Sequence, residues 1–300
     1  MAERTKPART FAWLEYLGVL RARGRDARKF LHAQLTNDIA GADPGSVTLA
    51  AWCDPKGRML ALFKVAVLAD DEVWLIAPAG VLDEVASPLS QFILRSRVKV
   101  DRVAARCIGV IGETDPSLPS PGRLTVLDAH IRLGIDEARV LIAGEPDILA
   151  RVAQGYREEE VCTWQLMDVD TGYPEVWPAT MGQFVPQMTN LDLIGGVSFS
   201  KGCYPGQEIV ARTQYLGRIK RRMFRLQINA TVPPKPGDAV ENDAGVRIGT
   251  VVRAATQPKH KDPTDGIRAL AVLRLDAVDG VIRMSTQRSA QAQLVPLPYT

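Results

Sequence analysis

Residues 201 to 208, KGCYPGQE, place a thiol, an amine and two glycines in one short segment. The residues just before this segment predict a strand at Val197 to Phe199. Pro205 suits the first turn of a helix, where its missing N–H costs nothing. Gly202 and Gly206 permit backbone angles that are closed to other residues. We therefore expect a strand, a tight loop and a helix over this segment.

Cys203 is the candidate reactive group of this loop, and Lys201 is its candidate partner in catalysis. A helix N-terminus just beyond the cysteine and a nearby ammonium group both favour the thiolate, which is the reactive form. The sequence places no histidine close by to act as a base, although the fold can bring one. The alternative is that Cys203 packs as a small buried hydrophobe, as most free cysteines do.

A second stretch, TWQLMDVDTGYPEVW at residues 163 to 177, gathers aromatic rings and carboxylates before a Gly-Tyr-Pro turn. A flat heteroaromatic ligand needs aromatic walls and an acid that accepts its N–H groups. Trp164 and Asp170 are the residues of this stretch that we consider for such a ligand. The alternative is that the tryptophans belong to the core and that the aspartates are solvated turn residues.

The third candidate is the basic run LGRIKRRMFRL at residues 216 to 226. Its cations could contact RNA or an anionic tail. The usual explanation of such a run is a solvated strand face. We expect nucleic-acid binding to be unlikely here, and a strong salt dependence of RNA affinity would reveal it.

Composition excludes several other classes of function. The four cysteines and three histidines are dispersed, without zinc spacing or a histidine pair at i and i+4, so we expect no resident metal and no self-contained iron–sulfur cluster. There is no phosphate loop and no dinucleotide fingerprint. The net charge is +3, which allows an anionic ligand. No apolar run or signal-type segment is present, so we expect a cytoplasmic protein without a membrane partner.

The hydrophobic pattern predicts a mixed chain of helices and strands with a composition shift near residue 225. Asp26 is expected to cap the first helix, and Asp54 to Gly57 is expected to form a hairpin turn. Residues 246–252, 267–275 and 292–295 read as short strands of a small barrel or sandwich. The predicted helices cover residues 24–39, 80–94 and 146–155, and the other predicted strands lie within residues 46–78 and at 98–102, 106–111, 123–126 and 140–143, with a proline-rich loop at 112–122.

The segment FVPQMTNLDLIGGVSFSKGCYPGQEIVAR, residues 184 to 212, resembles the signature of the folate-binding YgfZ family, which is related to the aminomethyltransferase of the glycine cleavage system. Three further segments resemble the family sequence at the corresponding places: FLHAQLTNDI near the start, CDPKGRM at residues 53 to 59 and the closing PLPY. The resemblance therefore extends over essentially the whole chain.

The resemblance implies an α+β, aminomethyltransferase-like fold in three parts. Two ferredoxin-like α+β portions would enclose a central channel, and a C-terminal β-barrel would close the assembly. Residues 1–45 and 162–224 would form the first, folate-binding portion that carries KGCYPGQE. Residues 46–161 would form the second α+β portion, and residues 225–300 the barrel.

The resemblance also implies an accessory factor that binds tetrahydrofolate or a derivative and assembles or repairs iron–sulfur clusters in client enzymes. Its partners would be those enzymes or cluster carriers, and some members influence tRNA modification. The motif cysteine and lysine match Cys203 and Lys201. A folate-contacting tryptophan falls on Trp164, and the acid that meets the pterin falls on Asp170, which is shorter than the usual glutamate.

Two departures from the family pattern affect the functional interpretation. A second family tryptophan falls on Leu17, with Trp13 close by, so one wall of the folate site differs. Ala61 and Leu62 stand where aminomethyltransferases carry a functional acid, so the usual acid–base group is missing. We therefore favour the accessory factor. The alternative is a folate-dependent aminomethyl or one-carbon transferase, and whether the protein is an enzyme stays open.

Overall fold

A computed structural model describes residues 9–112, 118–127, 129–215, 217–258 and 266–299 of the chain. The chain forms two compact units. Unit 1 comprises residues 1–30, 39–48 and 64–164, and unit 2 comprises residues 31–38, 49–63 and 165–300. The chain therefore passes between the units several times. The expected three-part division, with its boundaries at 45, 161 and 224, stays a prediction.

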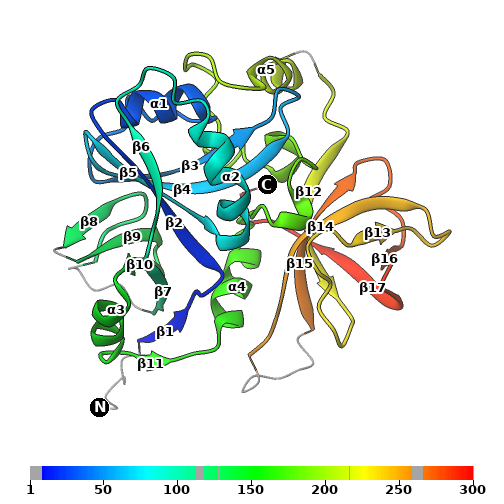
Figure 1. Cartoon of the computed structure of the whole chain (residues 1–300). Helices are drawn as coiled ribbons and strands as arrows, with labels where there is room; N and C mark the ends of the chain where they lie inside the picture. Colours follow the sequence, from blue (N-terminus) through cyan, green and yellow to red (C-terminus); the bar gives the residue numbers. More distant parts are fainter. Residues whose placement is uncertain (1–8, 113–117, 128, 216, 259–265, 300) are drawn as a thin grey trace. The chain divides into compact units, whose positions relative to one another are not determined.

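Unit 1 is built on β-sheets, whose strands are labelled in Figure 1. One sheet has the order β11-β1-β7-β10-β9-β8 and another has the order β3-β4-β5-β2-β6, in which β3 and β4 continue into unit 2. The strands of the first are Thr10–Trp13 (β1), Arg106–Ile111 (β7), Leu124–Leu127 (β8), His130–Asp136 (β9), Arg139–Gly144 (β10) and Arg157–Glu158 (β11). Those of the second are Leu17–Arg23 (β2), Ser46–Cys53 (β3), Met59–Ala69 (β4), Glu72–Pro78 (β5) and Lys99–Val103 (β6).

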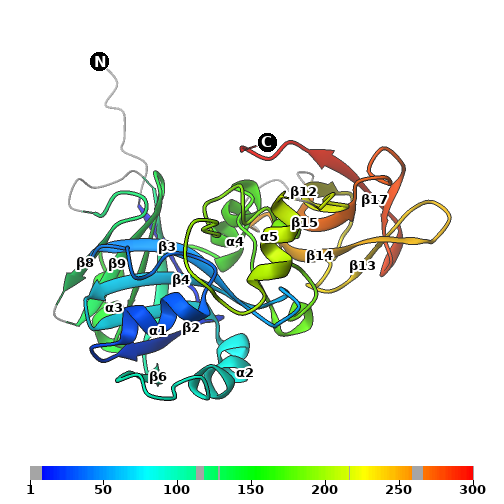
Figure 2. The same ribbon diagram turned by 90° about the horizontal axis from the view of Figure 1, so that it is seen from above.

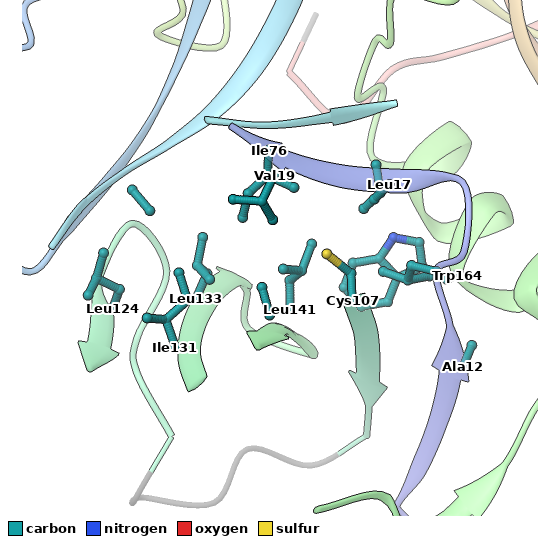
Figure 3. Close-up of a cluster of buried hydrophobic side chains, with 13 residues drawn as sticks. Ala12, Leu17, Val19, Ile76, Cys107, Leu124, Ile131, Leu133, Leu141 and Trp164 are labelled. Atoms are coloured by element: carbon teal, nitrogen blue, oxygen red, sulfur yellow. The ribbon is translucent and has the colours of Figure 1, made fainter. Parts of the chain in front are cut away.

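The core of unit 1 contains side chains from both sheets, which Figure 3 shows as sticks. Val19 and Ile76 come from the five-stranded sheet, and Leu133 and Leu141 come from the six-stranded sheet. Because inward positions alternate along each strand, the apolar residues of both sheets meet in one cluster. Trp164 is the largest side chain of this cluster and has no exposed surface.

Unit 2 contains a closed barrel with the strand order β12-β15-β14-β13-β16-β17, coloured from yellow to red in Figures 1 and 2. Closure removes the open edges that a sheet would otherwise present. This outcome agrees with the small barrel expected after residue 225. The barrel strands are Arg221–Ile228 (β12), Ala239–Glu241 (β13), Arg247–Thr256 (β14), Ile267–Arg274 (β15), Ile282–Met284 (β16) and Gln287–Val295 (β17).

The helices agree with the sequence pattern only in part. They are Ala27–Gln34 (α1), Ala79–Ser90 (α2), Pro146–Ala153 (α3), Val161–Asp170 (α4) and Gln207–Tyr215 (α5), and short 3₁₀ turns lie at Pro178–Thr180 and Pro186–Thr189. Helix α2 buries one apolar face, but it ends at Ser90 rather than at the predicted residue 94, and Phe92 beyond its end is exposed. Helix α4 was missed because buried neighbours on several sides leave it without an amphipathic period.

Three local predictions were wrong. Val197 to Phe199 is not a strand but an irregular approach to the loop. The first helix is shorter than the range 24–39. The carboxylate of Asp26 accepts a hydrogen bond from the backbone N–H of Arg97 at 2.7 Å instead of capping that helix. Part of the loop predicted at 112–122 lies outside the described residues.

Among the residues that the structure describes, no helix has the length and apolar character needed to cross a bilayer. The same described ranges contain no group of three or more histidine, cysteine, aspartate or glutamate side chains placed to hold a metal ion.

Candidate functional site

The KGCYPGQE loop belongs to unit 2, where it packs against the hairpin turn between β3 and β4. Gly206 has a φ of +78°, and a Cβ there would stand 2.4 Å from the carbonyl oxygen of Asp54. Gly57 in the facing turn has a φ of +72°. Both positions therefore need glycine, for conformation and for close approach. Gly202 is different, because its φ is not in the positive region, so the expectation of a special backbone angle at Gly202 was wrong.

Lys201 anchors the start of the loop to the C-terminal end of α1. Its Nζ donates hydrogen bonds to the carbonyl oxygens of Leu35, at 2.7 Å, and of His32. These carbonyls lie at a helix C-terminus, where a cation is favourable. Burial lowers the pKa of Lys201 to about 8, although the charges of Asp38 and Cys203 oppose that shift. Lys201 is thus a buried positioning residue as well as a charge beside the cysteine.

A histidine and a carboxylate lie beside the loop, although the sequence separates them from it by more than 160 residues. Nδ1 of His32 lies 2.9 Å from Oδ1 of Asp38. Nε2 of the same imidazole lies 3.7 Å from the point where a Cβ on Gly202 would stand. Gly202, the residue that precedes Cys203, therefore lies close to the imidazole of His32. This pair was not predictable from the sequence, since no spacing rule connects residues 32 and 38 with residue 203.

Cys203 is the exposed member of the four cysteines, all of which the structure describes. Cys53 and Cys107 are buried, and burial raises the pKa of Cys107 to about 12 and that of Cys53 further. Burial and the charge of Glu160 raise the pKa of Cys162. Helix α5 begins four residues after Cys203, at Gln207. The alternative of a packed, hydrophobic Cys203 is therefore wrong.

Trp164 lies in the core of unit 1 with both faces of its indole in contact with protein. A Cβ on Gly109 would stand 2.2 Å from Cε3 of the ring, so the backbone of β7 lies directly against the indole. The guanidinium carbon of Arg139 lies 4.9 Å from the ring centroid. The indole N–H has no hydrogen-bond partner among the described residues. Trp164 thus offers an unpaired donor but no free aromatic face for stacking.

Asp170 lies in unit 2 beside a cavity of about 250 Å³. Its Oδ2 accepts a hydrogen bond from Arg268 at 2.5 Å, and its Oδ1 lies 3.5 Å from Nη1 of Arg225. The cavity is also lined by Gln227. A carboxylate, two guanidinium groups and an amide together offer both acceptors and donors to a small polar ring.

Asp168, from the same sequence stretch, has a different role. It forms an ion pair with Arg253 at 2.8 Å, and both side chains are almost fully buried. Removing one partner of such a pair leaves an uncompensated charge. Asp168 is therefore structural.

The two departures noted in the sequence lie in buried positions. Ala61 and Leu62 are both fully buried on β4. Leu17 belongs to the same cluster as Trp164, as Figure 3 shows, whereas Trp13 lies under the guanidinium of Arg106 at 4.7 Å. Leu17, rather than Trp13, is therefore the neighbour of Trp164 in the core.

The fold defines the class of protein. The chain superposes on the crystal structure of glycine cleavage system aminomethyltransferase T from Bartonella henselae with a TM-score of 0.71 and 15% identity, over 99% of this chain and 87% of that one. The protein therefore has the aminomethyltransferase fold, which confirms the expected fold class.

Sequence comparison identifies the family. The chain is 31% identical over 299 residues to the tRNA-modifying protein YgfZ of Yersinia pestis (strain Pestoides F), covering 92% of this chain and 88% of that protein. It is 30% identical over 295 residues to an uncharacterized protein of Haemophilus influenzae, covering 97% and 98% of the two chains. No family model matches the chain. The chain belongs to the YgfZ family.

Proposed function

We propose that the protein is a tetrahydrofolate-binding accessory factor that assembles or repairs iron–sulfur clusters in client enzymes, among them enzymes that modify tRNA. Cys203 is its reactive group. The observation that carries this proposal is an exposed thiol on a loop that Lys201 fixes beside the His32–Asp38 pair. The partners would be the client enzymes or the carriers that deliver clusters to them.

The chemistry of the loop begins with one proton transfer. In this proposal the imidazole of His32, which lies beside the residue that precedes Cys203, would take the Sγ–H proton of the cysteine, and this would leave a thiolate and an imidazolium. Asp38 accepts the hydrogen bond from Nδ1–H and stabilises the positive charge of the imidazolium. Lys201 contributes a further positive charge next to the thiolate. The thiolate can then bind iron of the client's cluster, which is the cargo, because thiolates are the usual ligands of such clusters.

The residues fit a reduced folate in part. Asp170 and its cavity suit the pterin ring, because the carboxylate accepts N–H bonds while the neighbouring arginines donate. Trp164 does not fit as a stacking platform, since both of its faces are covered. A bound folate would supply a carrier of one-carbon units. Its ring would be held at Asp170 rather than on the face of Trp164.

A folate-dependent aminomethyl transferase is the second candidate function. The family relationship and the fold favour it, whereas the apolar Ala61 and Leu62 oppose it, because neither can transfer a proton. A glycine-cleavage assay with purified protein separates the two candidates. Release of the one-carbon unit to tetrahydrofolate would favour the transferase.

The proposal is tested by complementation in cells that lack the native protein. We expect Cys203→Ala to fold normally, since the side chain is exposed, and to fail to restore activity of an iron–sulfur tRNA-modifying enzyme. Cys162→Ala is the matched control and should complement. His32→Gln should slow labelling of Cys203 by a thiol reagent at pH 7. Full complementation by Cys203→Ala would show that the thiol has no chemical role.

A further inference from the structure

Two neighbouring cavities of unit 2 share an arginine and form a basic region. One, of about 660 Å³, is lined by Arg218, Lys220, Arg221 and Arg274. The other, of about 400 Å³, is lined by Arg221 again and by Arg58 and Arg247. We call these six cations the basic surface. Asp276 is the one acidic residue among the lining residues of the two cavities.

The basic run of the sequence is divided by the fold into two groups. Arg222 is bound to Asp192 at 2.6 Å, and Arg225 donates to the carbonyl of Asp170, so these two side chains hold unit 2 together. Arg218, Lys220 and Arg221 are exposed and form no ion pair within the described part of the chain. The basic run is therefore not one uniform strand face, because two of its cations bind groups of unit 2 and three are exposed to solvent.

The cations of the basic surface come from several segments of the chain. Arg58 comes from the turn between β3 and β4, Arg247 from β14 and Arg274 from the end of β15. Arg247 is held in place by hydrogen bonds to the carbonyl of Gly249 and to Oγ1 of Thr250. The tertiary structure therefore brings cations from four separate segments to the same pair of cavities.

The single carboxylate does not neutralise this charge. Asp276 is paired with Arg274 at 2.6 Å and also interacts electrostatically with Lys220, which leaves four arginines of the surface without an acidic neighbour in the cavity linings, namely Arg58, Arg218, Arg221 and Arg247. Five of the six cations are arginines, whose planar guanidinium groups bind phosphate through two parallel hydrogen bonds. Leu275, which is exposed at the same cavity, offers an apolar contact for a base.

We infer that the basic surface binds the phosphate backbone of RNA. A spaced row of phosphates matches cations that are spread over two cavities, whereas a single small anion would need only one of them. The surface reaches the loop of Cys203, because Arg58 follows Gly57, and a Cβ on Gly206 would stand 2.6 Å from Cα of Gly57. The inference rests on the proposed function only in so far as the RNA is a tRNA.

The test is a titration of the full-length protein against bulk bacterial tRNA labelled with fluorescein at its 3′ end. Anisotropy is measured between 25 and 200 mM KCl for the wild type and for the variant Arg218→Gln/Lys220→Gln/Arg221→Gln. The matched control replaces three other exposed cations that form no ion pair among the described residues, Lys29, Arg95 and Arg151, by glutamine. Circular dichroism and thermal melting verify that each variant is folded.

We expect wild-type affinity to fall steeply with salt. The triple variant should lose at least about 10-fold in affinity at 100 mM KCl, and the slope of log K against log salt should shrink by about 2 to 3. The control variant should stay within about 2-fold of the wild type. Cys203→Ser should bind tRNA unchanged, so failure of the cysteine chemistry and failure of RNA binding give different results.

Three outcomes would overturn the inference. The first is that the wild-type protein does not bind tRNA at 25 mM KCl. The second is that both triple variants lose affinity for tRNA equally. The third is displacement of tRNA by poly-L-glutamate at equal charge concentration, which would assign the surface to an acidic protein segment instead.

Discussion

Replacement of Lys201 by methionine tests how the KGCYPGQE loop is held. Methionine fills a similar volume but donates no hydrogen bonds, so the buried carbonyls of Leu35 and His32 lose their partner. An orphaned buried carbonyl costs about 1–3 kcal/mol. Part of that loss is offset, because the variant no longer has the cost of burying an ammonium group. We expect Lys201→Met to lower the free energy of unfolding by about 2 kcal/mol at pH 7.

The pH dependence of this loss distinguishes a buried amine from an ordinary surface lysine. Burial lowers the pKa of Lys201 from 10.5 to about 8 in the folded state. Between these two values the unfolded chain binds the proton and the folded chain does not, so the free energy of unfolding rises with pH. The rise is about 1.4 kcal/mol per pH unit at most. The loss caused by Lys201→Met should therefore be larger at pH 9.5 than at pH 7.

The assay is urea denaturation of the wild type and the variant at pH 7, 8, 9 and 9.5. The difference between the two proteins at each pH removes the contribution of the other titrating groups. Lys56→Met is the matched control, because Lys56 is an exposed lysine of the facing turn. Lys56→Met should change the free energy of unfolding by close to zero at each of these pH values. A loss for Lys201→Met that does not change between pH 7 and 9.5 would refute the assignment of a buried amine with a depressed pKa.

Three further predictions follow from the site. Trp164→Ala should lower the free energy of unfolding by about 3–5 kcal/mol, because it leaves a large cavity in the core of unit 1, whereas Trp164→Phe should lower it much less. Similar melting temperatures for the two variants would contradict the burial of this side chain. Asp170→Asn should weaken binding of a reduced folate by about 1–3 kcal/mol, measured by calorimetry, and unchanged affinity would remove the pterin from this cavity. The purified protein should hold no stoichiometric iron–sulfur cluster after anaerobic reconstitution. Cys203 has no second cysteine close by in sequence, and the described residues contain no group of side chains placed to hold a metal ion. Full occupancy of a monomer by iron and sulfide would contradict this prediction.

Local chemistry was sufficient for much of the fold. The turn at Asp54 to Gly57 was predictable, because a proline and a glycine with positive φ make it in almost any context. The buried face of α2 and the barrel strands were predictable for a similar reason, since their periodicity reflects burial on one side. Helix α4 was not predictable, because contacts on several sides removed the period that marks a surface helix.

The sequence by itself determined that Cys203 lies in a glycine-bearing loop ahead of a helix, and the family resemblance was contained in that same text. Only the tertiary structure brought His32 and Asp38 to the loop, covered both faces of Trp164, and paired Arg222 while leaving Arg221 exposed. The physical reason is the distance along the sequence between the residues that interact. Turn geometry and periodicity depend on neighbours within a few residues, whereas burial, ion pairing and catalytic contact depend on residues that are distant in sequence and meet only when the chain packs.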